Sequence, residues 1–185
     1  MRKFIRYLSV GLLVIGLAAC DQKKDDTSDN HSAAASQQAA QTITLPAGKL
    51  SFTLPSGMTD QTGKLGTTTN NMHVYANSNG QQAVIVIVGS QTSDGLDVLT
   101  QRLEEQQRNR DPQLQVVSDK AITLSGQPAQ QLDTVISAKN QTNWSTVVMT
   151  KVGGQLVTLQ ISLPADNQAQ SQTTAEDIVK TITLN

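Results

Sequence analysis

The sequence predicts an α+β domain in which an antiparallel β-sheet is sandwiched by helices. Three observations favour this fold class. Short segments that alternate apolar and polar residues recur from Thr42 onward, with turn residues between them. Two segments, 94–110 and 173–182, carry apolar residues at helical spacing. The run 83–88 is apolar on both faces, which predicts a central strand with a layer above it and another below.

The first twenty residues resemble the signal of a bacterial lipoprotein. Basic residues precede a short apolar run that ends in Leu17-Ala18-Ala19-Cys20, and Cys20 is the single cysteine of the chain. The run is too short to cross a bilayer core, which takes about 20 residues, and it has the position of a cleaved signal. We expect cleavage after residue 19 and acylation of Cys20, for example with palmitate. The alternative is a soluble secretory signal with an incidental cysteine.

The two residues after Cys20 bear on which membrane would hold the anchor. An aspartate at this place, here Asp21, resembles the signal that retains enteric lipoproteins in the inner membrane, and Gln22 fits the stronger forms of that signal. The resemblance implies the inner membrane, on its periplasmic side. An incidental acidic residue at the start of a polar segment is the alternative.

The chain divides into three parts on composition. Residues 1–19 form the expected signal peptide, 20–41 a lipidated and disordered tether, and 42–185 the folded domain. The tether has almost no large apolar residue, so it cannot bury enough surface to offset the entropy of ordering. The whole chain has 14 Lys and Arg against 15 Asp and Glu. Without a basic stripe, we expect no nucleic-acid binding.

The folded part is expected to contain nine strands and two helices. Asn79-Gly80 and Gly153-Gly154 are typical of tight hairpin turns. A long polar loop is expected at 56–71. Asp94 is expected to cap the first helix and Thr173, with Glu176, to form a capping box at the second. The expected strands are 42–45, 49–54, 72–76, 82–88, 114–117, 121–124, 130–138, 144–152 and 155–163.

The helices are expected to be amphipathic. In the first, the apolar face is Leu96, Leu99, Leu103 and, less apolar, Gln106, with Arg102, Glu104, Glu105 and Arg108 pointing outward. In the second, the apolar stripe is Ala175, Ile178, Val179 and Ile182.

Side chains for catalysis are scarce in this sequence. There are two histidines, and His31 lies in the tether, so only His73 is available as a base in the domain. A surface or partly buried strand histidine is the commoner outcome. No spacing of Cys, His and carboxylates indicates a metal site; the acidic residues at 21, 25, 26 and 29 lack the glycine and closing glutamate of a calcium loop. The segment 63–66 lacks the pattern of a phosphate-binding loop.

Few residues indicate a binding surface. Trp144 is either an exposed contact residue or, more commonly, part of the edge of the core. The arginines at 102, 108 and 110 could attract anionic headgroups, but Glu104 and Glu105 lie between them, which favours an ordinary solvated helix face. Neither observation defines a site.

Segments along nearly the whole chain match the sequence of a known family. They are LSFTLP (50–55), MTDQTGKLG (58–66), NNMHV (70–74), AVIVI (83–87), RLE (102–104), QQR (106–108), RDPQLQVV (110–117) and LPAD (163–166). With these segments the chain resembles the DcrB family of enterobacterial inner-membrane lipoproteins, and the tether is the weakest part of the match. The resemblance implies a fold of the PsbP and Mog1 type, a link to envelope integrity and membrane homeostasis, and a requirement in infection by certain bacteriophages. It carries no catalytic motif and no cofactor; only Cys20 and Asp21 carry over as functional positions.

Three hypotheses about function remain open at this point. The first is a non-enzymatic interaction module with an envelope protein partner, used by phage during DNA entry. The second is a carrier or chaperone that holds a small apolar or lipid ligand between sheet and helix. The third, an enzyme that uses Ser or Asp without histidine, has the least support in the residues.

Overall fold

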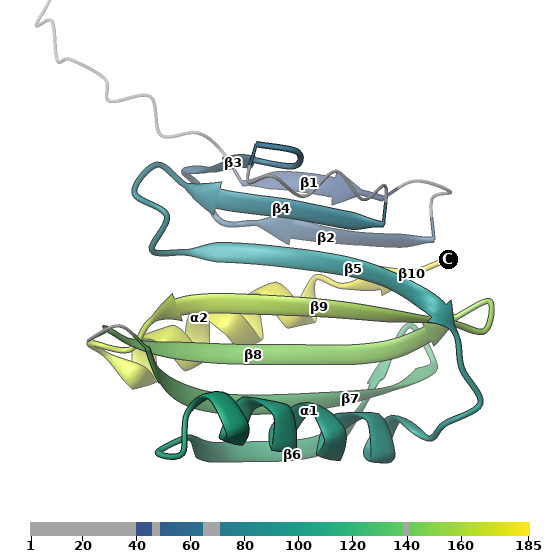
Figure 1. Cartoon of the computed structure of the whole chain (residues 1–185). Coiled ribbons are helices and arrows are strands. Elements are labelled where there is room, and N and C mark those ends of the chain that lie inside the picture. Colours follow the sequence, from purple (N-terminus) through teal and green to yellow (C-terminus); the bar gives the residue numbers. More distant parts are fainter. Residues whose placement is uncertain (1–39, 46–48, 65–70, 139–140) are drawn as a thin grey trace, which may run out of the picture. The chain divides into compact units, whose positions relative to one another are not determined.

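The computed structural model describes residues 40–45, 49–64, 71–138 and 141–185 (Figure 1). In these residues the chain forms two antiparallel sheets and two helices. The larger sheet has seven strands in the order β3-β4-β5-β9-β8-β7-β6, and the smaller has three in the order β1-β2-β10. The expectation of an α+β fold built on antiparallel strands is confirmed, although the second sheet was not expected.

The element bounds follow the turn residues of the sequence closely. They are β1 (Gln41–Thr44), β2 (Leu50–Leu54), β3 (Met58–Asp60), β4 (Met72–Asn77), β5 (Ala83–Gln91), α1 (Leu96–Arg110), β6 (Gln115–Leu124), β7 (Gln127–Ala138), β8 (Gln141–Val152), β9 (Gln155–Pro164), α2 (Gln168–Lys180) and β10 (Thr183–Leu184).

Tight turns set the register of the long hairpins. Gly153 and Gly154 join β8 to β9 with φ of 58° and 83°, left-handed values that suit glycine and the twist of a two-residue hairpin. Asn79-Gly80 lies in the turn between β4 and β5, where Asn77 and Gln82 are the last residues bonded across the hairpin. Both turn predictions are confirmed.

The helices lie on opposite faces of the larger sheet (Figure 1). α1 covers β7 and β8, and α2 packs on β8 and β9 from the other side. The smaller sheet lies on the α2 side, where Phe52 of β2 meets Tyr75 of β4 edge to face with ring centroids 5.9 Å apart. Leu50, Phe52 and Leu54 share one face of β2 and are buried there, as alternation along a strand requires. The main core therefore fills the space between the larger sheet and the layer formed by α2 and the smaller sheet.

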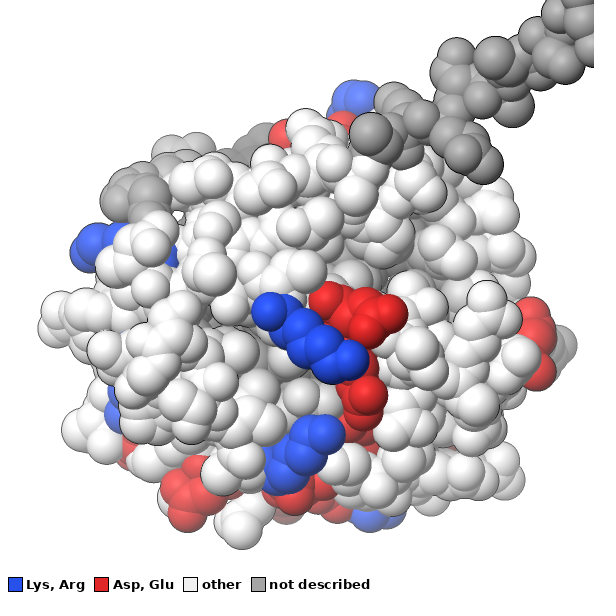
Figure 2. Space-filling view, turned by 180° about the vertical axis from the view of Figure 1, so that it is seen from behind, with Lys and Arg blue, Asp and Glu red and all other residues white. Residues whose placement is uncertain are grey.

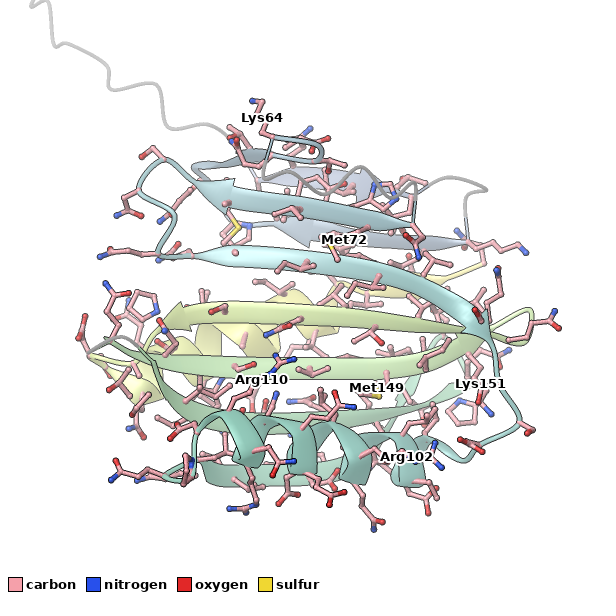
Figure 3. All side chains as sticks on the ribbon, viewed as in Figure 1. Lys64, Met72, Arg102, Arg110, Met149 and Lys151 are labelled. Atoms are coloured by element: carbon pink, nitrogen blue, oxygen red, sulfur yellow. The ribbon has the colours of Figure 1, made fainter. Side chains whose placement is uncertain are left out.

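α1 differs from its prediction in its start and in its buried face. Gly95, not Asp94, is the N-cap, and no side chain caps the helix; Asp94 instead pairs with Arg102. Thr100 and Gln107 are buried, whereas Gln106 is exposed. The Thr100 hydroxyl lies 3.9 Å from Met149 Sδ, and Figure 3 shows Met149 on β8 next to the helix. Gln107 can be buried because the sheet beneath α1 offers the Thr134 hydroxyl, which donates to Gln107 Oε1 at 3.3 Å.

α2 begins six residues earlier than the capping box predicts. Asn167 is the N-cap, and its side-chain oxygen accepts a hydrogen bond from the Gln170 N–H at 3.2 Å. Thr173 lies inside the helix and donates to the Ala169 carbonyl at 2.9 Å, so the predicted capping box is wrong. The predicted stripe of Ala175, Ile178, Val179 and Ile182 is buried as expected, with Ile182 just beyond the helix end.

Three strand predictions also need correction. The segments 114–117 and 121–124 belong to one strand, β6, with a register shift between Val116 and Ser118. The predicted loop 56–71 contains β3, and its residues 65–70 lie outside the described part. β5 is an interior strand, but α1 does not extend over it (Figure 1). Ile85 and Ile87, on the face that α1 leaves uncovered, are therefore only partly buried. Val84 and Val86 on the opposite face are fully buried.

Candidate functional site

A groove lies between α2 and β6 on the side of the molecule shown in Figure 2, where acidic and basic side chains gather around a hollow. Its volume is about 410 Å³, within the range of roughly 300–1,000 Å³ that small-molecule sites occupy. α2 forms one wall and β6 the other. The lining residues are Lys120, Ile122, Thr123, Leu124 and Ser125 with Gln131, Glu176, Val179, Lys180 and Ile182.

The floor of the groove is a buried amide. Gln131 of β7 is only 3% exposed, and its Nε2 donates to both carboxylate oxygens of Asp133, at 3.2 and 2.9 Å. Among the described residues no donor reaches its other end, Oε1. A flipped amide would turn Oε1 toward the Asp133 carboxylate, so the acceptor is fixed in its orientation. An unsatisfied buried acceptor costs about 1–3 kcal/mol, which makes Oε1 a natural contact for a ligand.

Behind this amide a chain of hydrogen bonds crosses the sheet. The Thr146 hydroxyl donates to Asp133 Oδ1 at 2.6 Å, and the Trp144 indole N–H donates to the Thr146 oxygen at 2.9 Å. Asp133 and Trp144 are each 1% exposed and Thr146 is fully buried. Within the described residues no cation pairs with Asp133, so its carboxylate is stabilised by hydrogen bonds from Gln131 and Thr146. These hydrogen bonds connect the groove floor to Trp144, the one tryptophan of the sequence.

The rim of the groove carries charges of both signs. Lys120 extends from β6, while Glu176 and Lys180 extend from α2. Lys180 pairs with Asp177 at 3.2 Å, and Glu176 accepts a hydrogen bond from the Gln172 side chain at 3.4 Å. In the described part of the chain, neither Lys120 nor Glu176 belongs to an ion pair. The groove therefore has an acceptor at its floor, apolar walls and two unmatched charges at its rim.

Sequence reasoning missed this site, although a signal for it was present. The register of β7 places Ala129, Gln131, Asp133 and Val135 on the core face, so two polar residues occupy positions that alternation assigns to the interior. Buried polar residues of this kind need partners. Noting them in the sequence would have pointed to the floor of the groove, but not to the wall that α2 adds.

His73 lies away from this groove, on β4 beside Asp60 and Tyr75. The strand pairing sets Asp60 opposite Tyr75. Hydrogen bonding by Thr62, first through its side chain and then through its backbone N–H, holds the pKa of Asp60 below its usual value, and the charge of His73 acts in the same direction. Burial raises the pKa of Tyr75, with a further contribution from the Asp60 charge. No side-chain hydrogen bond involves His73 in the residues described, so no activated nucleophile is formed there.

The remaining candidate residues are accounted for by ordinary structure. Trp144 is buried, as the core interpretation predicted. Arg102 pairs with Asp94, and Arg108 pairs with Glu104 at 2.8 Å. Figure 3 shows Arg102 and Arg110 at well-separated points along α1. The arginines are therefore spread along a solvated helix, and two of the three are held in ion pairs.

Other expected positions lie outside the described residues. These are Cys20, Asp21 and Gln22 with the whole signal and most of the tether, the acidic residues at 25, 26 and 29, His31, and residues 65–66 of the segment 63–66. In the part of the chain that is described, no helix is long and apolar enough to span a bilayer. Nor do the described His, Cys, Asp and Glu side chains form any group of three placed to hold a metal ion.

Comparison with solved structures identifies the fold. The chain is similar to cyanobacterial PsbP (CyanoP) from Synechocystis sp. PCC 6803, with a TM-score of 0.61 and 13% identity over 85% of this chain and 98% of that one. It is also similar to LpqN of Mycobacterium tuberculosis, a protein involved in cell envelope biogenesis, with a TM-score of 0.52 and 16% identity over 79% and 90% of the two chains. At such identities the likeness shows the fold alone, and it confirms the expected PsbP-like architecture.

Comparison of sequences identifies the family. The chain is 54% identical to the inner membrane lipoprotein DcrB of Shigella flexneri over 184 residues, which cover the full length of both chains. The DcrB family model matches residues 50–181, a stretch that holds both helices, all the groove residues except Ile182, and the strands from β2 to β9. The resemblance seen in the sequence is confirmed, and the chain belongs to the DcrB family.

Proposed function

We propose that this protein is a lipid-anchored, periplasm-facing lipoprotein of the inner membrane that acts without catalysis, as an interaction module supporting cell-envelope integrity and membrane homeostasis. The observation that carries the proposal is the full-length similarity to an inner membrane lipoprotein. The lipoprotein-like leader of the sequence supports it independently. The scarcity of histidine and cysteine in the chain supports a role in binding rather than in chemistry.

The anchor has a specific chemistry in this proposal. Cys20 carries the lipid, and Asp21 with Gln22 retains the protein in the inner membrane. Mass spectrometry of the N-terminal peptide should show an acylated Cys20, and Cys20→Ser should release the protein from the membrane fraction. Asp21→Ser should move the anchored protein toward the outer membrane. A mature chain with an unmodified Cys20 would contradict the anchor.

The partner is proposed to be an envelope protein. Photoreactive residues placed in cells at exposed positions of α1, such as Glu105 and Asn109, and along 56–64 should capture one protein reproducibly from one of these surfaces. Positions on the opposite surface serve as controls. Capture of lipid alone would favour a carrier, and no specific capture from any surface would count against the interaction module.

Bacteriophage infection is the second part of the proposal, and family membership supports it. Cells that lack the gene should resist certain phages at adsorption or DNA entry, and should tolerate envelope stress poorly. Complementation with the full chain should restore both properties. A deletion strain with neither phenotype would remove the support for this role.

A carrier of a small apolar or lipid ligand is the alternative, and the groove between α2 and β6 favours it. Its apolar walls and polar floor suit an amphipathic molecule. Native mass spectrometry of the full chain, purified in detergent after expression in its envelope, should then show a bound lipid. A chain that stays free of lipid after exposure to envelope lipids would count against the carrier.

A further inference from the structure

We infer that the groove between α2 and β6 binds a phosphoethanolamine group, that is, a primary ammonium joined by a short linker to a phosphate. The ammonium lies between Gln131 at the floor and Glu176 at the rim, and the phosphate lies at the rim against Lys120. The inference goes beyond the proposed interaction with an envelope protein and does not depend on it.

The floor of the groove requires a hydrogen-bond donor. Gln131 Oε1 is the unmatched buried acceptor, and its orientation is fixed because Nε2 is held by Asp133. The Asp133 carboxylate lies directly behind the amide without a cation among the described residues, and Glu176 adds a second negative group from α2. A primary ammonium supplies three donors and a positive charge. It can therefore donate a hydrogen bond to Gln131 Oε1 and balance the negative charge of the nearby carboxylates.

The rim of the groove requires an anion. Lys120 on β6 has no acidic partner in the described residues, while Lys180 on α2 forms an ion pair with Asp177. A phosphate accepts charge-assisted hydrogen bonds from lysine, which acts on it as a point charge. Lys120 is therefore the principal contact, and Lys180 is a secondary one.

The two unmatched charges set what the ligand must carry. Lys120 and Glu176 do not pair with each other, so a ligand that meets both carries an ammonium and an anion. A neutral ligand would leave both charges unmatched, and a choline group has no N–H to donate to Gln131. A phosphoethanolamine group carries both charges, and Ile122, Leu124 and Val179 in the groove lining can contact the carbon atoms of its linker and of an attached glycerol.

The test uses the full-length chain in a maltoside detergent that contains neither phosphate nor amine. The probes are glycerophosphoethanolamine and glycerophosphocholine, which differ only in the methylation of the nitrogen. Fluorescence of Trp144, the one tryptophan of the chain, should report binding because Trp144 is hydrogen-bonded through Thr146 and Asp133 to the groove floor. Equilibrium dialysis with radiolabelled probes measures the binding directly. We expect the ethanolamine probe to bind at least about tenfold more tightly.

Surface variants test the assigned contacts without disturbing the core. Glu176→Gln and Lys120→Gln should each weaken binding of glycerophosphoethanolamine about tenfold, the loss expected for one charge-assisted hydrogen bond. Glu105→Gln and Lys64→Gln change the same residue types at exposed positions that do not line the groove, and should bind as the wild type does. Equal affinity for the two probes, unchanged binding by both groove variants, or no binding in dialysis would each overturn the inference.

A further comparison identifies the source of the headgroup. The full chain is placed on nanodiscs of phosphatidylcholine with or without phosphatidylethanolamine. A change in Trp144 fluorescence that requires phosphatidylethanolamine, and that soluble glycerophosphoethanolamine reverses by competition, identifies a membrane lipid as the ligand. A response to the soluble probe alone identifies a free headgroup. Because the capture of a protein partner in cells is a separate measurement, failure here leaves the proposed function standing, and the reverse also holds.

Discussion

Thr146 occupies the centre of the buried chain of hydrogen bonds, so we expect a single substitution there to affect stability. Its hydroxyl accepts from the Trp144 indole and donates to Asp133, with no exposure to water. Thr146→Val keeps the shape but leaves a buried N–H without an acceptor and a carboxylate with one donor fewer. We expect the free energy of unfolding to fall by about 2–3 kcal/mol.

Urea denaturation monitored by Trp144 fluorescence measures this change. Thr173→Val is the matched control, because it removes a hydroxyl from an exposed position and should change stability by no more than about 0.5 kcal/mol. Equal effects of the two substitutions would show that the Thr146 hydroxyl contributes nothing specific to the core.

Asp60 should make the free energy of unfolding depend on pH in the acidic range. Thr62 and His73 lower the pKa of its carboxyl below the ordinary value of 3.8. Because the folded state favours the ionised form, this contribution is complete above 3.8 and is lost as the pH falls through the lowered pKa. Asp60→Asn cannot titrate. The difference in free energy of unfolding between the wild type and this variant should therefore stay constant above about pH 5 and shrink as the pH falls below 3.8 toward the lowered pKa. Parallel stability curves in urea would contradict this.

Prediction from the sequence succeeds at residues whose surroundings are local. Leu50, Phe52 and Leu54 alternate with polar residues in the expected strand 49–54, and the structure buries all three. Gln131 and Asp133 were not recognised, because their partners come from other strands and from α2. The sequence pattern shows on which face of a strand a polar residue lies. It does not show which group on another element forms a hydrogen bond with that residue.

At the scale of elements, two residues are candidates for the N-cap of α2, Asn167 in the structure and Thr173 in the sequence pattern. Asn167 accepts from the Gln170 N–H, whereas Thr173 lies well inside the helix. Asn167→Ala should therefore lower the free energy of unfolding by about 1 kcal/mol. Thr173→Ala should be neutral or slightly stabilising, because alanine has the higher helix propensity at an exposed interior position. Thermal or urea unfolding distinguishes the two, and a larger loss for Thr173→Ala would restore the capping box of the sequence.

Element prediction worked where periodicity was strong and failed where the chain has polar interruptions. β8 and β9 were located to within a few residues because their apolar periodicity is strong and glycines mark the turn. β6 was divided in two because Ser118, Asp119 and Lys120 interrupt its apolar pattern. At the edge of the sheet such residues are tolerated, since one side of the strand faces solvent.

For the molecule as a whole, the pairing of distant segments is what the sequence could not supply. The smaller sheet exists because β10, at the end of the chain, pairs with β2, for example Thr183 opposite Ser51. Two residues of strand have no recognisable pattern of their own. The same argument applies to the groove, whose walls lie far apart in sequence and meet only once α2 packs on the larger sheet.

Phe52 joins the two sheets, and its loss should show whether they unfold as one unit. Its ring is fully buried and contacts Tyr75 of the larger sheet. Phe52→Ala should cost about 3–5 kcal/mol, the range for removing a buried aromatic ring, while Val117→Ala, at a residue 46% exposed, should cost at most about 0.5 kcal/mol.

The decisive measurement compares two reporters in the Phe52→Ala protein. Trp144 fluorescence follows the larger sheet, and amide hydrogen exchange of β2 follows the smaller one. If the shared core makes the domain cooperative, both should lose stability by the same amount, because neither sheet can keep its buried face without the other. A loss of protection confined to β2, with the Trp144 transition unchanged, would instead make the smaller sheet a separately unfolding unit. In that case the wall of the groove formed by α2, which also packs on β2, would be free to move independently of the groove floor.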